Sequence, residues 1–204
     1  MGQSTKTRSL SDEEYELMLD TFSGRYMNRN RALFVLGCWT GYRISELLSL
    51  TIGHVYQRGR LVRDITITHT KNGHPRSVLF HPEAQEEVGI WLDELREWGI
   101  TDPKSPLFIS RKGNGRAISV VQAWEIISSA ADDNDLDGVI GTHSMRKTLG
   151  MRTWKIADIY GVAKVLGHRN AQSTEYYLEA GKKYVDSLLL SMSSSGKKNR
   201  RSRR

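Results

Sequence analysis

The sequence predicts an α+β fold that is mainly helical and carries a small antiparallel β-sheet. Apolar residues recur at helical spacing through most of the chain. The exception is segment 61–80, which is rich in β-branched residues and contains Asn72-Gly73, a strong signal for a tight turn between two strands. Neither an internal repeat nor a strong linker divides the chain. We therefore expect one domain over residues 1–192 and a basic, disordered tail over 193–204.

The helices ahead of the β segment are indicated by a capping pattern and by apolar runs. Ser11 and Glu14 form a capping-box pattern before the first helix. The second helix is an apolar run that ends near Gly41. The helices predicted in this part of the chain span residues 11–22, 31–39 and 44–50.

The remaining elements are predicted from helical spacing of apolar residues and from the alternation typical of strands. Leu61–Thr68 is predicted as one strand, and Ser77–Phe80 as the strand that returns beside it. Pro82 begins a helix whose apolar residues have helical spacing. Further helices are expected over 118–131 and through much of 143–192, with an acidic turn between them.

The composition is that of an ordinary globular protein with a basic end. The 204 residues are 38% hydrophobic and 26% charged, which is enough chain to bury a sizeable core. No apolar run is long enough to span a membrane, and the polar N-terminus lacks a secretory signal. Cys38, the single cysteine, excludes an internal disulfide and is expected in the core.

The charge is concentrated at one end of the chain. The formal net charge is +7, and six of these charges come from residues 197–204. Such a tail either binds the DNA backbone or is a solvated terminus, so charge alone does not establish nucleic-acid binding.

Three segments carry the side chains that phosphate chemistry needs, and each has an ordinary explanation when taken alone. Arg43, at a helix start, could pair with Glu46 or Glu13. His143 and Arg146, three residues apart, could form an exposed polar face of a helix. In the third segment His168, which follows Gly167, could be a charge at a helix C-terminus.

Together, and in this order, the segments resemble the motifs of the tyrosine recombinases, the phage integrase family. The family's first box, Gly-hydrophobe-Arg-hydrophobe-Ser-Glu-Leu, is matched by residues 41–47. Its second box, His-x-x-Arg, is matched by His143 and Arg146. Its third, Leu-Gly-His followed by Thr-x-x-Tyr, is matched by 166–168 and 174–177.

The resemblance extends to the predicted hairpin and covers roughly residues 8–190. The family carries a lysine in a β-hairpin between the first two boxes, and Lys71 stands directly before Asn72-Gly73. Arg76 and Val78 follow at spacings similar to the family's. The resemblance thus implies the fold of a tyrosine recombinase catalytic domain over residues 1–192.

The resemblance also implies a role for each matched residue. Tyr177 would attack the scissile phosphate, which leaves a 3′-phosphotyrosine and a free 5′-hydroxyl. Arg43 and Arg146 would clamp the non-bridging oxygens, because a guanidinium binds phosphate bidentately and stays charged. Fixed cations at these oxygens would stabilise the negative charge of the transition state.

The other three residues would handle protons and hydrogen bonds. Lys71 would be the general acid that protonates the leaving 5′-oxygen. His143 would assist proton transfer at the tyrosine and hold the phosphate, and His168 would hydrogen-bond a phosphate oxygen. Because the covalent step conserves the bond energy, no cofactor, metal or ATP is expected.

Tyr176 and the histidines near the predicted hairpin suggest two other functional interpretations. Tyr176 is the rival nucleophile, but on a helix it points about 100° away from Tyr177, and the family's spacing favours Tyr177. The histidines near the hairpin lack the tight pattern of a zinc site, so we expect them to face DNA or solvent. They are His69, His74 and His81.

The resemblance implies a site-specific recombinase that acts on double-stranded DNA in integration, excision or inversion. Its expected partners are copies of itself, as a tetramer on DNA, and accessory DNA-bending proteins, but no membrane. Its expected location is the cytoplasm, at the nucleoid, or the host cytoplasm if a phage encodes it. A type IB topoisomerase-like nicking-closing enzyme and a non-catalytic DNA-binding protein are the alternatives.

Two features concern the ends of the chain. The ten residues before Ser11 cannot form the separate DNA-clamping domain of most family members, so the chain resembles either short members such as fimbrial-switch invertases or a trimmed piece of a longer protein. We hypothesise that the basic tail compensates in part. The apolar stretch 184–192 is expected either to pack onto a neighbouring protomer or to fold back onto its own domain.

Overall fold

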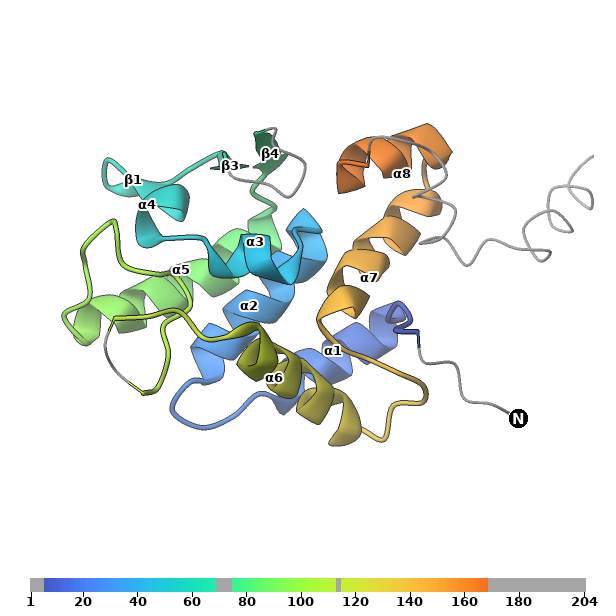
Figure 1. Ribbon diagram of the computed structural model, residues 1–204, viewed down its shortest axis with the longest axis horizontal. Coiled ribbons are helices and arrows are strands. Elements are labelled where there is room, and N and C mark those ends of the chain that lie inside the picture. The colour runs from blue at the N-terminus through green and yellow to red at the C-terminus, as the bar shows by residue number, and fades with distance from the viewer. Residues whose placement is uncertain (1–5, 69–74, 113–114, 169–204) are drawn as a thin grey trace, which may run out of the picture.

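A buried helix, α2 (Met27–Thr40), forms the centre of the fold, with its largest contacts to α5 (Pro82–Glu97) and α7 (Thr142–Trp154) (Figure 1). The structure, a computed structural model, describes residues 6–68, 75–112 and 115–168. Every residue from Ala32 to Cys38 is buried. A helix that is apolar on all sides must be surrounded by other elements, which is the position that α2 occupies.

The first helix, α1 (Asp12–Thr21), begins at the predicted capping box. The Ser11 hydroxyl accepts a hydrogen bond from the Glu14 backbone N–H at 3.1 Å, and the Glu14 carboxylate accepts one from the Ser11 N–H at 2.8 Å. Tyr15 then packs on Phe34 of α2 with ring centroids 5.1 Å apart. This contact anchors α1 on the core.

A series of short elements follows α2, namely α3 (Ile44–Leu48), α4 (Ile52–Val55) and two antiparallel hairpins. The small sheet predicted from the sequence is the pair β3 (Asp64–Ile67) and β4 (Arg76–Leu79), in which Ile65 is opposite Val78. Ile65 and Ile67 are buried, and Asp64 and Thr66, which alternate with them, are exposed, as a half-buried strand requires.

The second hairpin pairs β1 (Tyr56–Gln57) with β2 (Arg60–Leu61), so the described residues contain two small sheets rather than the single sheet predicted. Helix α4 was also not predicted. Elements of two to four residues are too short to show a periodicity, and this explains why the sequence did not indicate them.

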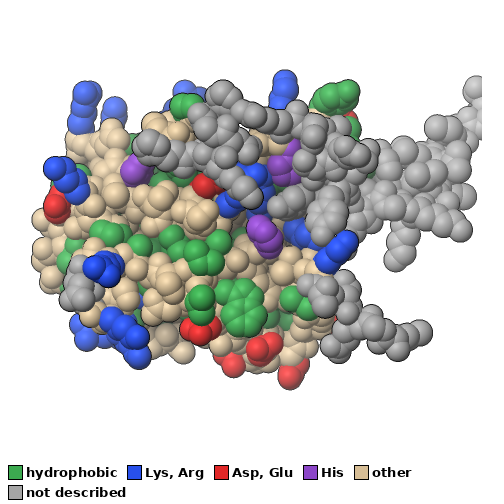
Figure 2. Space-filling view, in the orientation of Figure 1, with side chains coloured by type: hydrophobic (Ala, Val, Ile, Leu, Met, Phe, Trp, Pro, Cys, Tyr) green, Lys and Arg blue, Asp and Glu red, His purple; other side chains and the backbone are tan. Residues whose placement is uncertain are grey.

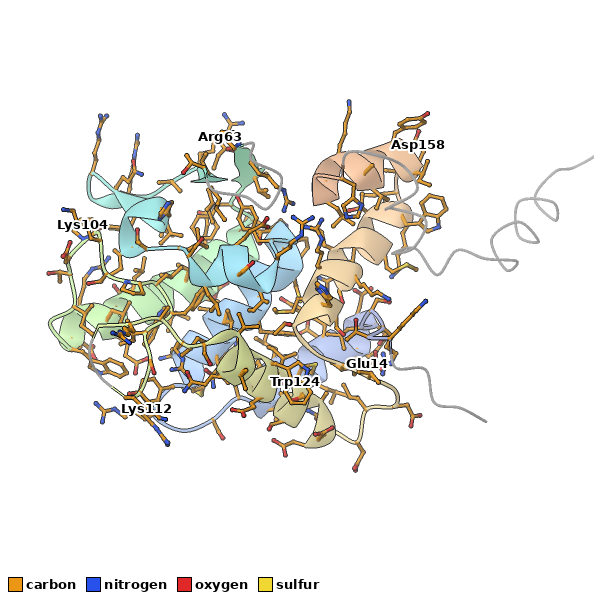
Figure 3. The ribbon with its side chains drawn as sticks, viewed as in Figure 1. Glu14, Arg63, Lys104, Lys112, Trp124 and Asp158 are labelled. Carbon is orange, nitrogen blue, oxygen red and sulfur yellow. The ribbon has the colours of Figure 1, made fainter. Side chains whose placement is uncertain are left out.

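The last described helices are α6 (Val120–Asp132), α7 and α8 (Ile159–Leu166). Asp158 caps α8, because its carboxylate accepts the Gly161 N–H at 2.8 Å (Figure 3). Helix α8 packs on α7 through a separate small apolar cluster of Leu149, Val162 and Leu166. The end of α8 thereby lies beside the middle of α7 (Figure 1).

The predicted helices that fall within the described residues are confirmed with shifted bounds, and Cys38 is fully buried as expected. Helix α2 begins at Met27, four residues before the predicted start. No helix in the described ranges has the length and apolarity that a membrane crossing needs. The predicted Asn72-Gly73 turn and the stretch 169–204 lie outside the described residues.

Candidate active site

Arg43 is held at the start of α3 by the turn that ends α2. Gly41 takes a left-handed conformation with φ +57°, and its N–H donates to the Gly37 carbonyl at 3.1 Å. Glycine favours this conformation because it has no Cβ, and the turn redirects the chain from α2 into α3. Tyr42 is buried, as expected of a core residue, and its hydroxyl donates to the Ile65 carbonyl at 2.7 Å.

A buried carboxylate fixes the Arg43 side chain. Glu46, whose side chain is 3% exposed, accepts the Arg43 backbone N–H at 2.8 Å and its Nη1 at 3.0 Å. Arg43 therefore forms the ion pair with Glu46 that the sequence suggested. It also orients the guanidinium, since both carboxylate oxygens bond to the same residue.

Arg146 joins two helix ends that are distant in the sequence. It is 1% exposed, and its Nη2 donates to the Leu166 carbonyl at 2.6 Å while its Nη1 donates to the Gly41 carbonyl. Gly41 precedes Arg43 by two residues and Leu166 precedes His168 by two. The interpretation of His143 and Arg146 as an exposed polar face holds for His143, which is exposed, but is wrong for Arg146, which is buried.

His168 follows directly on the end of α8. Gly167 has φ +67° and closes the helix, and the His168 N–H then donates to the Ala163 carbonyl at 2.8 Å. Burial, together with the positive charges of Arg146, Arg43 and Arg76, lowers the pKa of His168 to about 4. His168 is therefore neutral at physiological pH. The interpretation of His168 as a charge at a helix C-terminus is wrong.

His143, in the first turn of α7, has the same electrostatic surroundings. Burial lowers its pKa, and so do the charges of Arg146, Arg43 and Lys147. A neutral imidazole has one donor and one acceptor nitrogen, so each histidine can donate a hydrogen bond and can accept a proton. Figure 2 shows histidine side chains next to lysine or arginine side chains near the middle of the face in view.

Arg76, the first residue of β4, joins the same group. Its Nη2 donates to the Thr40 carbonyl at 2.8 Å and to the Val165 carbonyl at 2.6 Å, and its Nη1 donates to the Gly41 carbonyl at 3.2 Å. Arg76 and Glu46 were not among the predicted site residues. The signals that could have found them are the family-like spacing of Arg76 and the place of Glu46 within the first box.

The site residues come from four parts of the chain, which the fold brings together. Four of the six predicted residues, namely Arg43, His143, Arg146 and His168, lie among the described residues, and mutual electrostatic effects connect them. Lys71 and Tyr177 lie outside the described residues, as does Tyr176. The nearby positive charges and neutral histidines can bind an anion and transfer protons.

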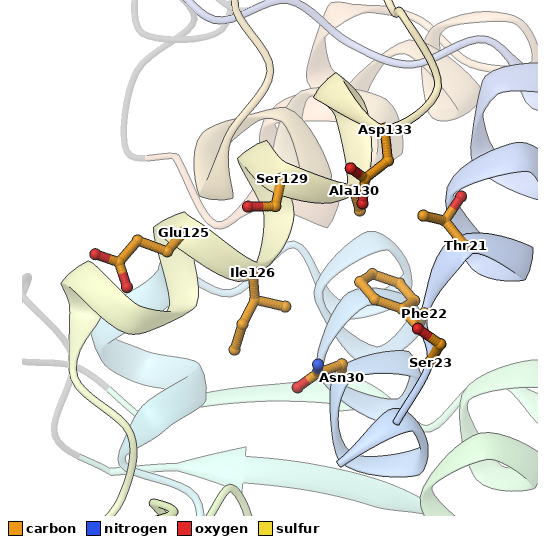
Figure 4. A pocket seen from close by; sticks show the side chains of 9 residues that line it. All are labelled: Thr21, Phe22, Ser23, Asn30, Glu125, Ile126, Ser129, Ala130 and Asp133. Carbon is orange, nitrogen blue, oxygen red and sulfur yellow. The ribbon is translucent and has the colours of Figure 1, made fainter. Parts of the chain in front are cut away.

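A surface cavity of about 310 Å³ lies elsewhere, where the end of α1 meets α2 and α6 (Figure 4). None of the predicted site residues lines it; its lining includes Phe22, Asn30 and Ile126. The anion-binding group is thus separate from this cavity.

The described residues contain no cluster of three or more histidine, cysteine or acidic side chains that could hold a metal ion. His81 stacks on Trp39 with ring centroids 3.6 Å apart and caps α5, where its Nδ1 accepts the Glu83 N–H at 3.4 Å. His81 thus has contacts within the protein and stays partly exposed, and its expected facing toward DNA stays a prediction. His69 and His74 lie outside the described residues.

Known proteins resemble this chain in sequence. The model of the Phage integrase family matches residues 8–183. Type 1 fimbriae regulatory protein FimE of Escherichia coli (strain K12) is 30% identical over 176 residues, which cover 85% of this chain and 86% of FimE. Tyrosine recombinase XerD of Halalkalibacterium halodurans is 26% identical over 178 residues, which cover 86% of this chain and 58% of XerD. The chain thus spans little more than half the length of that relative.

Solved structures share the fold. The XerA recombinase matches with a TM-score of 0.73 and 21% identity, over 93% of this chain and 65% of that one. The XerH site-specific recombinase bound to palindromic difH substrate has a TM-score of 0.70 and 22% identity, over 89% of this chain and 52% of XerH. The catalytic domain of bacteriophage HP1 integrase matches with a TM-score of 0.56 and 17% identity, over 94% of this chain and 98% of that one.

The resemblance first drawn from three short motifs is therefore confirmed by a family match over most of the chain and by the shared fold. This protein belongs to the phage integrase family, the tyrosine recombinases.

Proposed function

We propose that this protein cleaves and rejoins double-stranded DNA as a site-specific recombinase, with Tyr177 as the nucleophile. The observation that carries the proposal is the convergence of Arg43, His143, Arg146 and His168. Arg146 and the Gly41 carbonyl that it contacts are 105 residues apart in the sequence. A buried charge such as Arg146 is costly, and its place beside a second arginine and two histidines with lowered pKa values favours a shared task for these groups.

The chemistry follows from the charges. The Tyr177 oxygen attacks phosphorus, the bond to the 5′-oxygen breaks, and the 3′-phosphate is left on the tyrosine. Arg43 and Arg146 stabilise the negative charge on the non-bridging oxygens. His168 donates a hydrogen bond to one of them.

Two proton transfers accompany the exchange of bonds. A tyrosine has a pKa of about 10, so it needs a base to attack at neutral pH. His143 serves here, since its lowered pKa keeps it neutral and able to accept the proton. Lys71 protonates the leaving 5′-oxygen. Attack by the 5′-hydroxyl of another strand then reverses these steps and releases the tyrosine.

The partners are proposed on the same basis. The XerH structure is that of a recombinase bound to its difH substrate, which supports DNA as the partner of this chain. We place the catalytic domain over residues 1–192 and propose that it works as a tetramer on DNA in the cytoplasm, with accessory DNA-bending proteins. The basic residues 197–204 would add contacts to the DNA backbone.

The test uses a nicked suicide DNA substrate drawn from a pool of genomic fragments, because the native site is unknown. Wild type, Tyr177→Phe and the neighbouring control Tyr176→Phe are incubated with the pool in EDTA and without ATP. We expect an SDS-resistant protein–DNA adduct with wild type and with Tyr176→Phe, and none with Tyr177→Phe. An adduct that persists in Tyr177→Phe would refute the assignment of the nucleophile.

Strand exchange between two sites then separates recombination from topoisomerase-like nicking and closing. DNA binding without any adduct, by a folded wild-type protein, would favour the non-catalytic alternative.

A further inference from the structure

The proposed chemistry does not use Arg76, although its side chain contacts both helix ends beside the site. Thr40 and Gly41 close α2, and Val165 lies in the last turn of α8, 89 residues further along the chain than Arg76. One guanidinium donates to a carbonyl of each of these residues. Arg76, in strand β4, therefore connects the C-terminal ends of α2 and α8.

Electrostatics explains why a cation is needed at this place. The last carbonyls of a helix have no partner within the helix and carry partial negative charge. Two helix C-termini that lie side by side repel each other unless positive charge lies between them. Arg76 and Arg146 supply that charge, and both donate to the Gly41 carbonyl.

The cost of this arrangement shows in the side chain itself. Burial and the adjacent positive charge of Arg146 together lower the pKa of Arg76 to about 10. At neutral pH the guanidinium is still charged. The protein thus keeps two guanidiniums close together, and the carbonyl acceptors offset their repulsion.

Close packing fixes the position of Arg76. Its guanidinium lies over the Tyr42 ring, 4.8 Å from the centroid. On the other side, a Cβ at Gly167 would be 3.0 Å from both Cδ and Nε of Arg76. The Tyr42 hydroxyl also lies 3.2 Å from the Arg76 carbonyl. The side chain is thus enclosed by residues adjacent to Arg43 and His168.

From this geometry we propose that Arg76 is a positioning residue that sets the Arg43 turn and the His168 end of α8 relative to each other. The inference rests on the proposed recombinase function and deepens it. Arg43 is two residues beyond Gly41, and His168 three beyond Val165, so a shift of either helix end displaces a group that contacts the phosphate. A displacement of about 1 Å can cost about 100-fold in rate.

The chain offers a matched control in Arg29, at the other end of α2. Arg29 is buried, whereas Arg76 is half-buried, and like Arg76 it donates to a backbone carbonyl, that of Ile109 at 2.9 Å, and lies over a tyrosine ring, 4.5 Å from the centroid of Tyr26. Burial lowers its pKa to about 10 as well. Arg29→Gln therefore reproduces the general loss of a buried arginine without touching the site.

The experiment compares wild type, Arg76→Gln, Arg76→Lys and Arg29→Gln. Each is measured at a temperature at which thermal unfolding shows that it is folded. The readouts are the DNA dissociation constant and the single-turnover rate of adduct formation at saturating protein. For Arg76→Gln we expect a rate about 10- to 100-fold below that of Arg29→Gln. The dissociation constant should change less than about threefold, and Arg76→Lys, which keeps the charge but not the planar fork, should recover part of the rate.

Equal rates for Arg76→Gln and Arg29→Gln would overturn the proposal, and so would a loss confined to the dissociation constant. A second readout does not depend on activity, namely hydrogen exchange of the His168 amide, which is bonded to Ala163. We expect faster exchange in Arg76→Gln and no change in Arg29→Gln, and unchanged exchange in both would refute the positioning role. If wild type forms no adduct, the recombinase assignment fails, whereas this exchange still decides the role of Arg76.

Discussion

Substituting alanine for Gly41 tests how tightly the end of α2 fits against α7 and α8. Gly41 has φ +57°, a conformation that costs a residue with a Cβ about 1–2 kcal/mol. The new Cβ would also be 2.8 Å from Cδ2 of Leu149 and 3.2 Å from Cδ2 of Leu166, closer than carbon atoms normally approach. These leucines belong to the small cluster that fixes α8 on α7.

The two effects can be added approximately. Overpacking a core site costs about 1–3 kcal/mol, and the lower end applies because both contacted atoms are ends of leucine side chains that can shift. Alanine also restricts the unfolded chain, which returns about 0.4–1 kcal/mol. We therefore expect Gly41→Ala to lower the free energy of unfolding by about 2 kcal/mol.

Gly24→Ala is the control, because Gly24 has φ +74° and a Cβ there would meet no atom within 4 Å. Gly24→Ala therefore has the energetic cost of a positive φ but no steric clash of the new Cβ. Equilibrium urea unfolding of both variants and wild type measures the difference, with the slope m checked for constancy. If Gly41→Ala is no less stable than Gly24→Ala, the packing argument is wrong.

Three further predictions concern local contacts. Ser11→Ala removes the capping hydroxyl of α1 and should cost about 1 kcal/mol in thermal unfolding; an unchanged melting temperature would contradict the role of the cap. Glu46→Gln weakens the two bonds to Arg43 and should cost about 2 kcal/mol and slow adduct formation; a variant with wild-type rate would show that the pair does not position Arg43. His168, with a folded pKa of about 4 against about 6.5 unfolded, contributes stability that is complete above pH 6.5 and is lost as the pH falls toward 4. The loss in free energy of unfolding would be at most about 3 kcal/mol, and less because the side chain is only half-buried. The stability of His168→Asn should therefore depend less on pH than that of wild type. Equal slopes of the free energy of unfolding against pH would argue against the shift in pKa.

The sequence by itself determined most of the local structure. The Ser11 capping box, the apolar run of α2 and the β3–β4 pair were all predicted from residues a few positions apart, because helix and strand periodicities are short-range. It also supplied the candidate site residues, since their order along the chain resembles the family's motifs. The catalytic roles of all six, Lys71 and Tyr177 included, stay predictions on that basis.

Only the tertiary structure decided how the site residues are held. The sequence does not reveal that Arg146 is buried between the ends of α2 and α8, or that Arg76 contacts the same carbonyls. Nor does it show that both histidines are neutral, which depends on burial beside arginines from other elements. The physical reason is that these contacts join side chains to backbone carbonyls 20, 89 and 105 residues away in the sequence, and packing of α2, α7 and α8 sets their geometry.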